Sequence, residues 1–184
     1  KLFETFLKQS QDKSRLGQFF TPRKVVRAII EMADVENLTD GAKICDPFCG
    51  VGGFLLEPLN KTKRKNDYIP KNGKIKPKIS LLGYDKGLDS DEERTIILAK
   101  ANMLIYLSEI VEKYPTLTKE FSKVFNSTFH LLSDSNLGTL KKVSDSEDER
   151  FDLILTNPPY ITSGVTSIKG EIKSENLEEY YTCA

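Results

Sequence analysis

Hydrophobic and polar positions first predict a helix near the start of the chain. From residue 22 to 33 apolar side chains recur at helical spacing, after Thr21 as the expected N-cap and with Pro22 in the first turn. The apolar positions of this stretch are Val25, Val26, Ile29, Ile30 and Ala33. One face is therefore apolar, which is typical of a helix that packs on a core.

Short apolar runs predict four strands, and each run meets polar residues at its carboxyl end. They cover residues 42–46, 78–85, 129–132 and 151–156. Between the strands, residues 47–53 form a glycine-rich turn that leads into an apolar helix, and a second helix runs from the capping box at Ser90 to about Tyr114. This alternation predicts an α/β fold with a doubly wound, mostly parallel, Rossmann-like sheet.

A strongly basic segment interrupts this pattern between the first two strands. Residues 60–78 carry eight Lys or Arg together with several Asn, Pro and Gly residues. Such a composition buries little, so we expect a flexible loop over about residues 60–78. The loop could contact a DNA backbone, although a solvated surface loop is the favoured interpretation.

The overall composition fits one globular domain. The chain has 184 residues, 39% of them hydrophobic, and a formal net charge of zero. Neutrality argues against a surface that is basic all over, so any contact with nucleic acid should be local. The sequence has no apolar run that could span a membrane and no signal-like segment, and its three cysteines then favour a reducing, cytoplasmic location.

The polar residues at the strand ends suggest a nucleoside ligand with an amino-acid tail. The turn at Gly50 and Gly52 lacks the lysine of a triphosphate-binding loop, and Asp46 before it would repel phosphate but attract an ammonium group. Asp85 stands where such folds bind ribose hydroxyls, and Asp134 could accept a hydrogen bond from an exocyclic amine. Alternatively, these are polar residues that merely end strands.

Asn157-Pro158-Pro159-Tyr160 follows the last predicted strand and is the sharpest chemical feature. The prolines stop the strand and remove backbone donors, which leaves the Asn157 amide and carbonyl oxygens as acceptors. The Asn157 side-chain oxygen and the Pro158 carbonyl could hold the two hydrogens of a planar amine. Tyr160 could stack on a base flipped out of a duplex.

Three segments together resemble the class I S-adenosylmethionine-dependent methyltransferases, in particular the amino-group DNA methyltransferases and the modification subunits of type I restriction-modification systems. The segments are Gly17–Pro22, Asp46–Phe54 and Asn157–Tyr160, in the order the family uses. Residues 99–103 also resemble a helix segment of the type I subunits. The resemblance implies methyl transfer to N6 of a flipped adenine in duplex DNA.

The resemblance also implies a role for each motif residue. Gln18, Phe19 and Thr21 would contact the methionine end of S-adenosylmethionine, and the glycine-loop residues the same region. Asp85 would bind the ribose and Asp134 the adenine of the cofactor. The glycine-loop residues are Asp46, Pro47, Gly50 and Gly52, and the residues that would hold the target are Asn157, Pro158, Pro159 and Tyr160. No metal is expected, and specificity and restriction subunits would be the partners.

Family members extend beyond this chain on both sides. We therefore expect one truncated catalytic domain over residues 1–184, with a helical lead over 1–33 and the cofactor and catalytic core over 42–160. A methyltransferase for protein glutamine or RNA and a cofactor-binding scaffold without activity stay open as alternatives. Cytosine N4 also stays open as a target, although Asn157 favours adenine.

The cysteines and the histidine predict no further chemistry. Cys45 and Cys49 have no His or second Cys pair that would complete a zinc site. The sequence contains no Pro-Cys pair, so the covalent mechanism of a cytosine C5-methyltransferase is not expected. His130, the single histidine, is expected to be structural.

Overall fold

The structure is a computed structural model, which describes residues 21–85, 92–131, 150–158, 165–174 and 176–180. Its sheet contains β1 (Lys43–Asp46), β2 (Ser80–Asp85), β3 (Phe129–Leu131) and β4 (Leu153–Ile154). The strand order is β3-β2-β1-β4, and all three pairings are parallel. The predicted α/β class with a mostly parallel sheet is confirmed.

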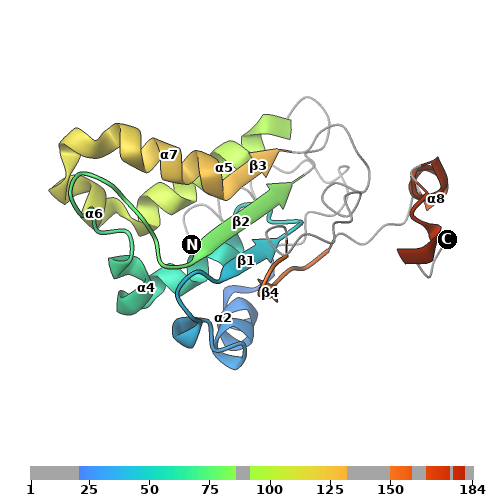
Figure 1. The fold of residues 1–184 in the computed structure, drawn as a ribbon, viewed down its shortest axis with the longest axis horizontal. Coiled ribbons are helices and arrows are strands. Elements are labelled where there is room, and N and C mark those ends of the chain that lie inside the picture. The colour runs from blue at the N-terminus through green and yellow to red at the C-terminus, as the bar shows by residue number, and fades with distance from the viewer. Residues whose placement is uncertain (1–20, 86–91, 132–149, 159–164, 175, 181–184) are drawn as a thin grey trace.

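The direction of the chain through the sheet reverses beside β1. The chain passes from β1 to β2 and then β3 on one side, whereas β4 returns to the other side of β1 (Figure 1). In open α/β sheets such a reversal leaves a crevice beyond the carboxyl ends of the two strands, because the connections leave in opposite directions. The ends of β1 and β4 therefore mark the place where a ligand is expected.

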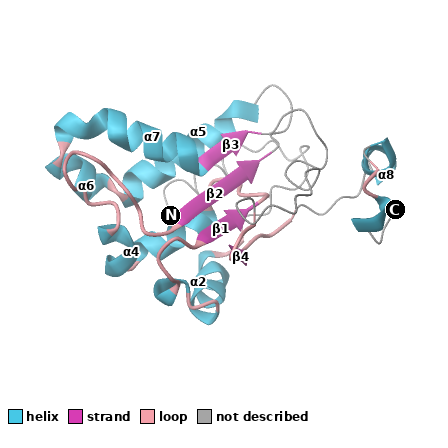
Figure 2. Cartoon of the chain, viewed as in Figure 1, coloured by secondary structure: helices cyan, strands magenta, loops and turns pink. Residues whose placement is uncertain are grey.

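The helices of the described residues lie next to the strands, except for one that lies apart (Figure 2). The α-helices are α2 (Arg23–Met32), α3 (Gly53–Leu56), α4 (Thr62–Asn66), α5 (Glu92–Tyr106), α6 (Ser108–Lys113), α7 (Thr118–Thr128) and α8 (Val165–Ser174). The 3-10 turns are η1 (Val35–Asn37), η2 (Glu57–Asn60), η4 (Pro115–Leu117) and η7 (Glu178–Tyr180). Helix α8 is the one that stands away from the sheet in Figures 1 and 2.

The first predicted helix is confirmed as α2, but its start differs from the prediction. Pro22 is the N-cap, and no side chain caps the helix. The Pro22 carbonyl accepts hydrogen bonds from the amides of Val25 and Val26, while the Thr21 hydroxyl contacts a distant segment instead. Thr21 is therefore not the N-cap. Val26 and Ile30 are buried as the periodicity predicted.

The predicted helix from residue 90 to about Tyr114 is two helices in the structure. Helix α5 ends at Tyr106 and α6 begins at Ser108, on either side of the fully buried Leu107. Leu107 packs in the core but leaves the helical backbone, with φ −99° and ψ 7°. Packing therefore overrides a sequence pattern that would continue the helix. The capping residue Ser90 lies outside the described residues.

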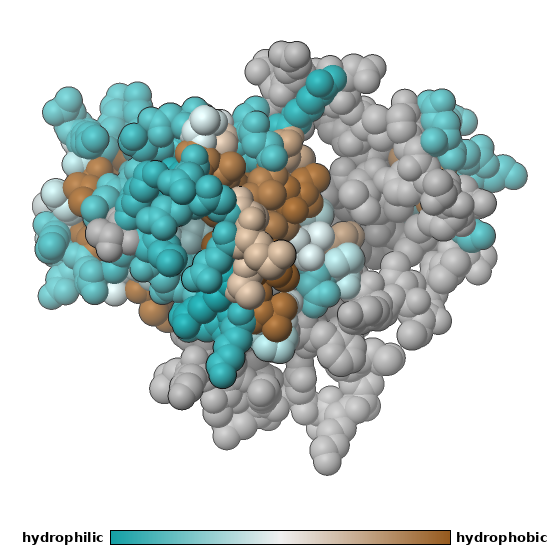
Figure 3. Space-filling model, turned by 90° about the horizontal axis from the view of Figure 1, so that it is seen from below, coloured by the Kyte–Doolittle hydropathy of each residue, from teal (hydrophilic) through white to brown (hydrophobic). Residues whose placement is uncertain are grey.

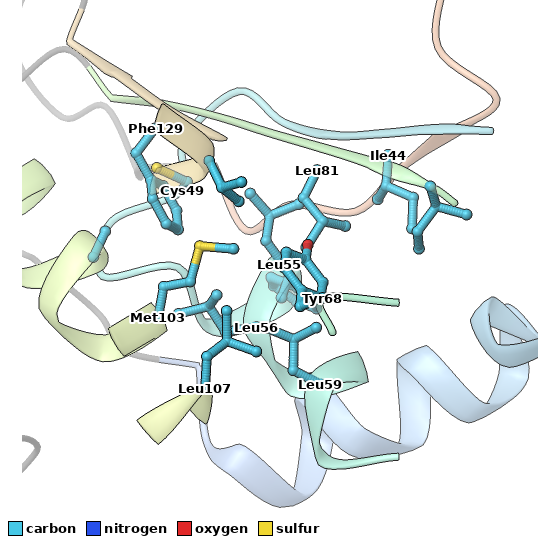
Figure 4. Close-up of a cluster of buried hydrophobic side chains, with 14 of the residues drawn as sticks. Ile44, Cys49, Leu55, Leu56, Leu59, Tyr68, Leu81, Met103, Leu107 and Phe129 are labelled. Carbon is cyan, nitrogen blue, oxygen red and sulfur yellow. The ribbon is translucent and has the colours of Figure 1, made fainter. Parts of the chain in front are cut away.

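The core lies between the sheet and helices α3 and α5. Leu55, Leu56, Met103 and Phe129 are buried in one cluster with the strand residues Ile44 and Leu81 (Figure 4). Gly83 allows this close approach, since a β-carbon there would lie 2.8 Å from both Leu55 Cδ1 and Phe129 Cδ1. The sheet is therefore held rigidly behind its carboxyl edge.

The prediction that residues 60–78 form a loop that buries little is wrong. This segment contains α4, and it buries Arg64, Tyr68 and Ile75. The Arg64 guanidinium donates to three backbone carbonyls, those of residues 35, 36 and 38, at 3.2, 2.8 and 2.8 Å. A count of lysines could not reveal this, because the buried arginine depends on carbonyl partners that lie elsewhere in the sequence.

The described surface has a mostly polar part and a part where apolar side chains are exposed. In the view of Figure 3, hydrophilic residues cover much of one side and hydrophobic residues gather toward the middle. The large hydrophobic side chains with the greatest exposure are Val25, Met32, Ile97, Leu104, Ile105 and Ile154.

Among the described helices, none is both long and apolar enough to cross a membrane.

Candidate active site

The candidate site lies at the carboxyl ends of β1 and β4, where the chain direction reverses. Asp46 is the last residue of β1, and Asn157 follows β4 by three residues. Pairing of Cys45 with Ile154 brings these two strand ends together. The structure describes Thr21, Asp46, Pro47, Gly50, Gly52, Asp85, Asn157 and Pro158 of the predicted site. Gln18, Phe19, Asp134, Pro159 and Tyr160 lie outside the described residues.

Asp46 is a buried carboxylate at the centre of this edge. Its side chain is 1% exposed, and one oxygen accepts a hydrogen bond from the Phe48 amide at 3.2 Å. Burial raises its pKa to about 6, against the lowering effect of the Thr156 hydroxyl and the Phe48 amide. A carboxylate in this state would be stabilised by a cationic group of a ligand.

The Thr156 hydroxyl lies beside Asp46 and is itself buried. It is close enough to lower the pKa of Asp46, yet it forms no hydrogen bond of normal geometry with any described residue. A buried hydroxyl without a partner is costly, so the described part of the chain leaves the bonding of this one group incomplete. Both groups point to a polar ligand at the end of β1.

The glycine loop is held from two sides. The amides of Cys49 and Gly50 donate to the Tyr84 carbonyl and to Asp85 Oδ2, each at 2.8 Å. From α5, Asn102 Nδ2 donates to the Val51 carbonyl at 3.0 Å. The structure thus brings Gly50 and Asp85 together, but it commits the Gly50 amide to Asp85 rather than directing it to a ligand.

Positive φ angles explain why glycines form this loop. Gly50 has φ +51° and Gly52 has φ +81°, which other residues adopt only with strain. A β-carbon on Gly52 would also lie 2.9 Å from the Phe129 ring, whereas one on Gly50 would meet no described heavy atom within 4 Å. Gly52 therefore serves packing, and Gly50 borders open space at the site.

Asn157 contacts the segment that precedes α2. Its side-chain Nδ2 donates to the Thr21 hydroxyl oxygen at 3.0 Å, and both side chains are half-buried. The two residues belong to motifs at opposite ends of the sequence, which the fold brings into direct contact. The sequence analysis predicted both residues as site residues, but it did not predict the hydrogen bond between them.

A buried carboxylate that the sequence analysis missed anchors α2 next to Thr21. Glu57 is 5% exposed and accepts hydrogen bonds from Arg23 Nε at 2.9 Å and from Arg27. Tyr106 of α5 donates to Glu57 and accepts from Arg23. Burial raises the pKa of Glu57, but the bonds from Arg27 and Arg23 outweigh it and hold the pKa below its usual range. An acid inside the apolar run 54–59 was the available signal.

The cysteines and His130 contribute no reactive group in the described structure. Burial raises the pKa of Cys45 to about 12, and it raises that of Cys49 further, so neither thiol is ionised at neutral pH. His130 stacks on Tyr84 with 5.1 Å between the ring centres. Among the described residues, no group of three or more His, Cys, Asp or Glu side chains could hold a metal ion.

The basic segment lies at the opposite edge of the sheet. It leads directly into the amino end of β2, and the Gly41 amide before β1 donates to the Lys78 carbonyl at 2.7 Å. In Figure 1 this segment reaches the end of the sheet that faces away from the arrowheads. These lysines therefore lie at the end of the sheet away from the candidate site, which disfavours the alternative that the segment contacts a DNA backbone there.

A family model and several known proteins match this chain. The family model described as N-6 DNA Methylase matches residues 1–181. The EcoEI methylase subunit of a type I restriction enzyme from Escherichia coli is 28% identical over 86% of this chain and 26% of its own length. A tRNA (guanine(10)-N2)-dimethyltransferase from Methanocaldococcus jannaschii is 30% identical over 92% of this chain and 38% of its own.

A solved structure is also similar. A modification subunit of a putative type I restriction enzyme from Vibrio vulnificus YJ016 matches with a TM-score of 0.55 and 26% identity, over 92% of this chain and 30% of that chain. The chain thus spans well under half the length of these relatives. The resemblance expected from the three motifs is confirmed over nearly the whole chain, and the protein belongs to the N-6 DNA methylase family.

Proposed function

We propose that this protein transfers a methyl group from S-adenosylmethionine to N6 of adenine in duplex DNA, as the modification component of a restriction-modification system. The observation that carries this proposal is that the buried Asp46 and Asn157 stand at the carboxyl ends of two paired parallel strands, at the reversal point of the sheet. Residues 42–160 would form the cofactor and catalytic core. Membership of the N-6 DNA methylase family supports the reaction class.

The residues present fit the cofactor. Its ammonium group would stabilise the buried Asp46 carboxylate, whose raised pKa reflects a burial cost that a cation would offset. Open space beside Gly50 leaves room for the methionine end. A carboxylate can accept more than one hydrogen bond, so Asp85 could bind ribose hydroxyls while it holds the Gly50 amide.

Asn157 and Pro158 would prepare the amine. S-adenosylmethionine supplies an electrophilic methyl group when bound, and the amine of adenine is a weak nucleophile because its lone pair is delocalised into the ring. The Asn157 side-chain oxygen and the Pro158 carbonyl would each accept one amine hydrogen. This would localise the lone pair on nitrogen and direct it to the methyl group, so that the nitrogen–carbon bond would form as the methyl–sulfur bond breaks. The neutral thioether would be the leaving group and the amine would lose one proton to solvent, with positioning as the main source of rate.

The remaining predicted residues keep their proposed roles. Gln18 and Phe19 would join Thr21 at the methionine end, Pro47 and Gly52 would shape the loop, and Asp134 would bind the cofactor adenine. Pro159 would stiffen the exit from β4, and Tyr160 would stack on the flipped adenine in place of its lost neighbours, which is worth about 1–3 kcal/mol per base. Specificity and restriction subunits would complete a type I complex.

A second candidate is methylation of an exocyclic amine in RNA. The similarity to a tRNA guanine-N2 enzyme favours it, since guanine N2 is also a planar amine that the Asn157 and Pro158 oxygens could hold. The similarity to the type I subunits in both sequence and structure favours DNA. A protein-glutamine substrate would use the same acceptors, so substrate choice needs a direct test.

The test is single-turnover methylation by the full protein as encoded, with labelled cofactor and defined duplex DNA, tRNA or protein substrates. We expect label in duplex DNA, on adenine N6 after digestion to nucleosides. Asn157→Ala should abolish transfer and lower cofactor affinity far less than the rate, because the oxygen that it removes is assigned to the target and the Nδ2 that it removes reaches the cofactor side only through its bond to Thr21. Asn66→Ala, an exposed change on α4, should leave the rate unaltered.

Three results would contradict the proposal. Label in tRNA or protein but not in DNA would show that duplex DNA is not the substrate. A parent protein that binds cofactor but methylates nothing would indicate a scaffold. Equal loss of cofactor binding and transfer in Asn157→Ala would contradict the role of the amide.

A further inference from the structure

The hydrogen bond between Thr21 and Asn157 joins two segments that are 136 positions apart in sequence. Asn157 Nδ2 is the donor and Thr21 Oγ1 the acceptor, at 3.0 Å. Within the described residues, no other hydrogen bond of either side chain is present. The bond is therefore the one described contact that orients the Asn157 amide.

Orientation is decisive for an asparagine side chain because its two ends have opposite chemistry. The oxygen accepts hydrogen bonds and the nitrogen donates them, and rotation by half a turn exchanges the two. An amine held by Asn157 needs the oxygen end. With Nδ2 bonded to Thr21, the oxygen is the end of the amide that points away from Thr21.

We propose that Thr21 is a positioning residue for the methyl transfer, whose hydroxyl holds Asn157 with its side-chain oxygen toward the target amine. This inference rests on the proposed function, since it assigns the Asn157 oxygen to the amine. It adds a second role for the segment before α2, which is to orient Asn157 in addition to contacting the cofactor.

Both partners are attached to rigid elements, which a positioning bond requires. Arg23, two residues after Thr21, is bonded to the buried Glu57 and to Tyr106. On the other side, the Leu155 amide of the segment that carries Asn157 donates to the Cys45 carbonyl of β1 at 3.0 Å. The bond therefore connects the α2 anchor to the sheet.

The hydroxyl has one hydrogen and two lone pairs, so it can serve either end of the amide unless its hydrogen is engaged elsewhere. An anionic acceptor near Thr21 would engage that hydrogen and leave the oxygen able only to accept. Asn157 would then be fixed with Nδ2 toward Thr21. A carboxylate at the methionine end of the cofactor has the required chemistry, so cofactor binding would set the orientation of the amide before the base enters.

The test compares Thr21→Val, which keeps the shape but removes the hydroxyl, with Thr21→Ser, which keeps it. The single-turnover rate is measured in the full protein at saturating cofactor and DNA, so that a loss of cofactor affinity alone does not lower it. We expect Thr21→Val to be slower by about 10- to 100-fold and Thr21→Ser to stay within about threefold of the parent. Thr39→Val, at an exposed threonine, should match the parent.

A second readout does not depend on catalysis. The unfolding equilibrium constants of Thr21→Val, Asn157→Ala and the double variant form a double-mutant cycle. If the bond exists, the increase of the unfolding equilibrium constant in the double variant should be about 3- to 10-fold smaller than the product of the two single increases.

The two readouts separate the possible failures. A Thr21→Val protein that reaches the parent rate at saturation, or a Thr21→Ser protein as slow as Thr21→Val, would overturn the inference. So would a cycle with no coupling. A parent protein that methylates none of the substrates would count against the proposed function instead, and the cycle would then decide whether Thr21 holds Asn157.

Discussion

Replacing the buried Asp46 by Asn should stabilise the protein while it weakens cofactor binding. Asn keeps the shape and one acceptor for the Phe48 amide, but it carries no charge to desolvate. Burial raises the pKa of Asp46 from 3.8 to about 6. The chain therefore bears a cost at its site when no cationic ligand is bound.

The size of this cost follows from the pKa. A rise of roughly two pH units corresponds to about 3 kcal/mol of destabilisation of the folded state when the carboxyl is ionised. The folded protein binds the proton more tightly than the unfolded chain, so the cost is absent below about pH 4 and complete above about pH 7. At pH 7.5 Asp46→Asn should raise the free energy of unfolding by about 1–3 kcal/mol, or the Tm by roughly 3–10 °C.

Urea unfolding of the parent and the variant from pH 4 to pH 8 measures this effect. The difference between the two proteins should grow with pH from about pH 4, level off through about pH 6 and be constant above about pH 7. Asp40→Asn removes the same charge at an exposed site with a surface ion pair to Lys78, and should change stability by less than about 1 kcal/mol. Titration calorimetry at pH 7.5 should show weaker S-adenosylmethionine binding by Asp46→Asn.

Two results would refute this reasoning. If Asp46→Asn is less stable than the parent across the range, or if the difference does not vary with pH, the carboxylate is not penalised by burial. Unchanged cofactor affinity in a stabilised variant would leave the burial argument intact and remove Asp46 from the proposed site.

Three further substitutions test the packing that supports the site. Gly83→Ala introduces two contacts of 2.8 Å and should cost about 1–3 kcal/mol in the free energy of unfolding, whereas Gly53→Ala, with open space at its β-carbon, should change it by less than about 1 kcal/mol. Arg64→Met leaves three backbone carbonyls without their charged donor and should cost roughly 3–5 kcal/mol in denaturant unfolding, against less than about 0.5 kcal/mol for the exposed Lys63→Met; equal effects would contradict a structural role for the buried arginine. Glu57→Gln should lower the Tm at neutral pH, whereas in acid the Tm of the variant should approach that of the parent. The pKa of this carboxyl is lowered in the folded state, so its stabilising effect is lost as pH falls through that folded pKa. A difference in Tm that persists in acid would contradict this.

Local patterns identified the strands and the polar residues that end them. Asp46 and Asp85 were predicted at the ends of their strands and lie there, because an apolar run that stops at an acid is visible within a few residues. The parallel sheet also followed, since strands separated by helices have few other ways to connect. The same local view failed for Leu107, where core packing interrupts a helix that the pattern would continue.

Composition was a poor guide to the basic segment. Its lysines dominate any average over residues 60–78, yet its structure depends on one arginine whose guanidinium reaches three carbonyls of an earlier turn. Burial of a charge depends on which partners surround it in space. Partners 26 to 29 positions away leave no mark in a local window.

The sequence by itself determined the α/β class, the order of the motifs and the residue types at the strand ends, because these depend on side-chain periodicity and on chemistry that is local to the chain. Only the tertiary structure decided that Thr21 bonds Asn157, that Asp85 holds the Gly50 amide, and that the basic segment lies away from the site. Such contacts depend on how strands and helices pack, and packing joins residues that no sequence pattern relates.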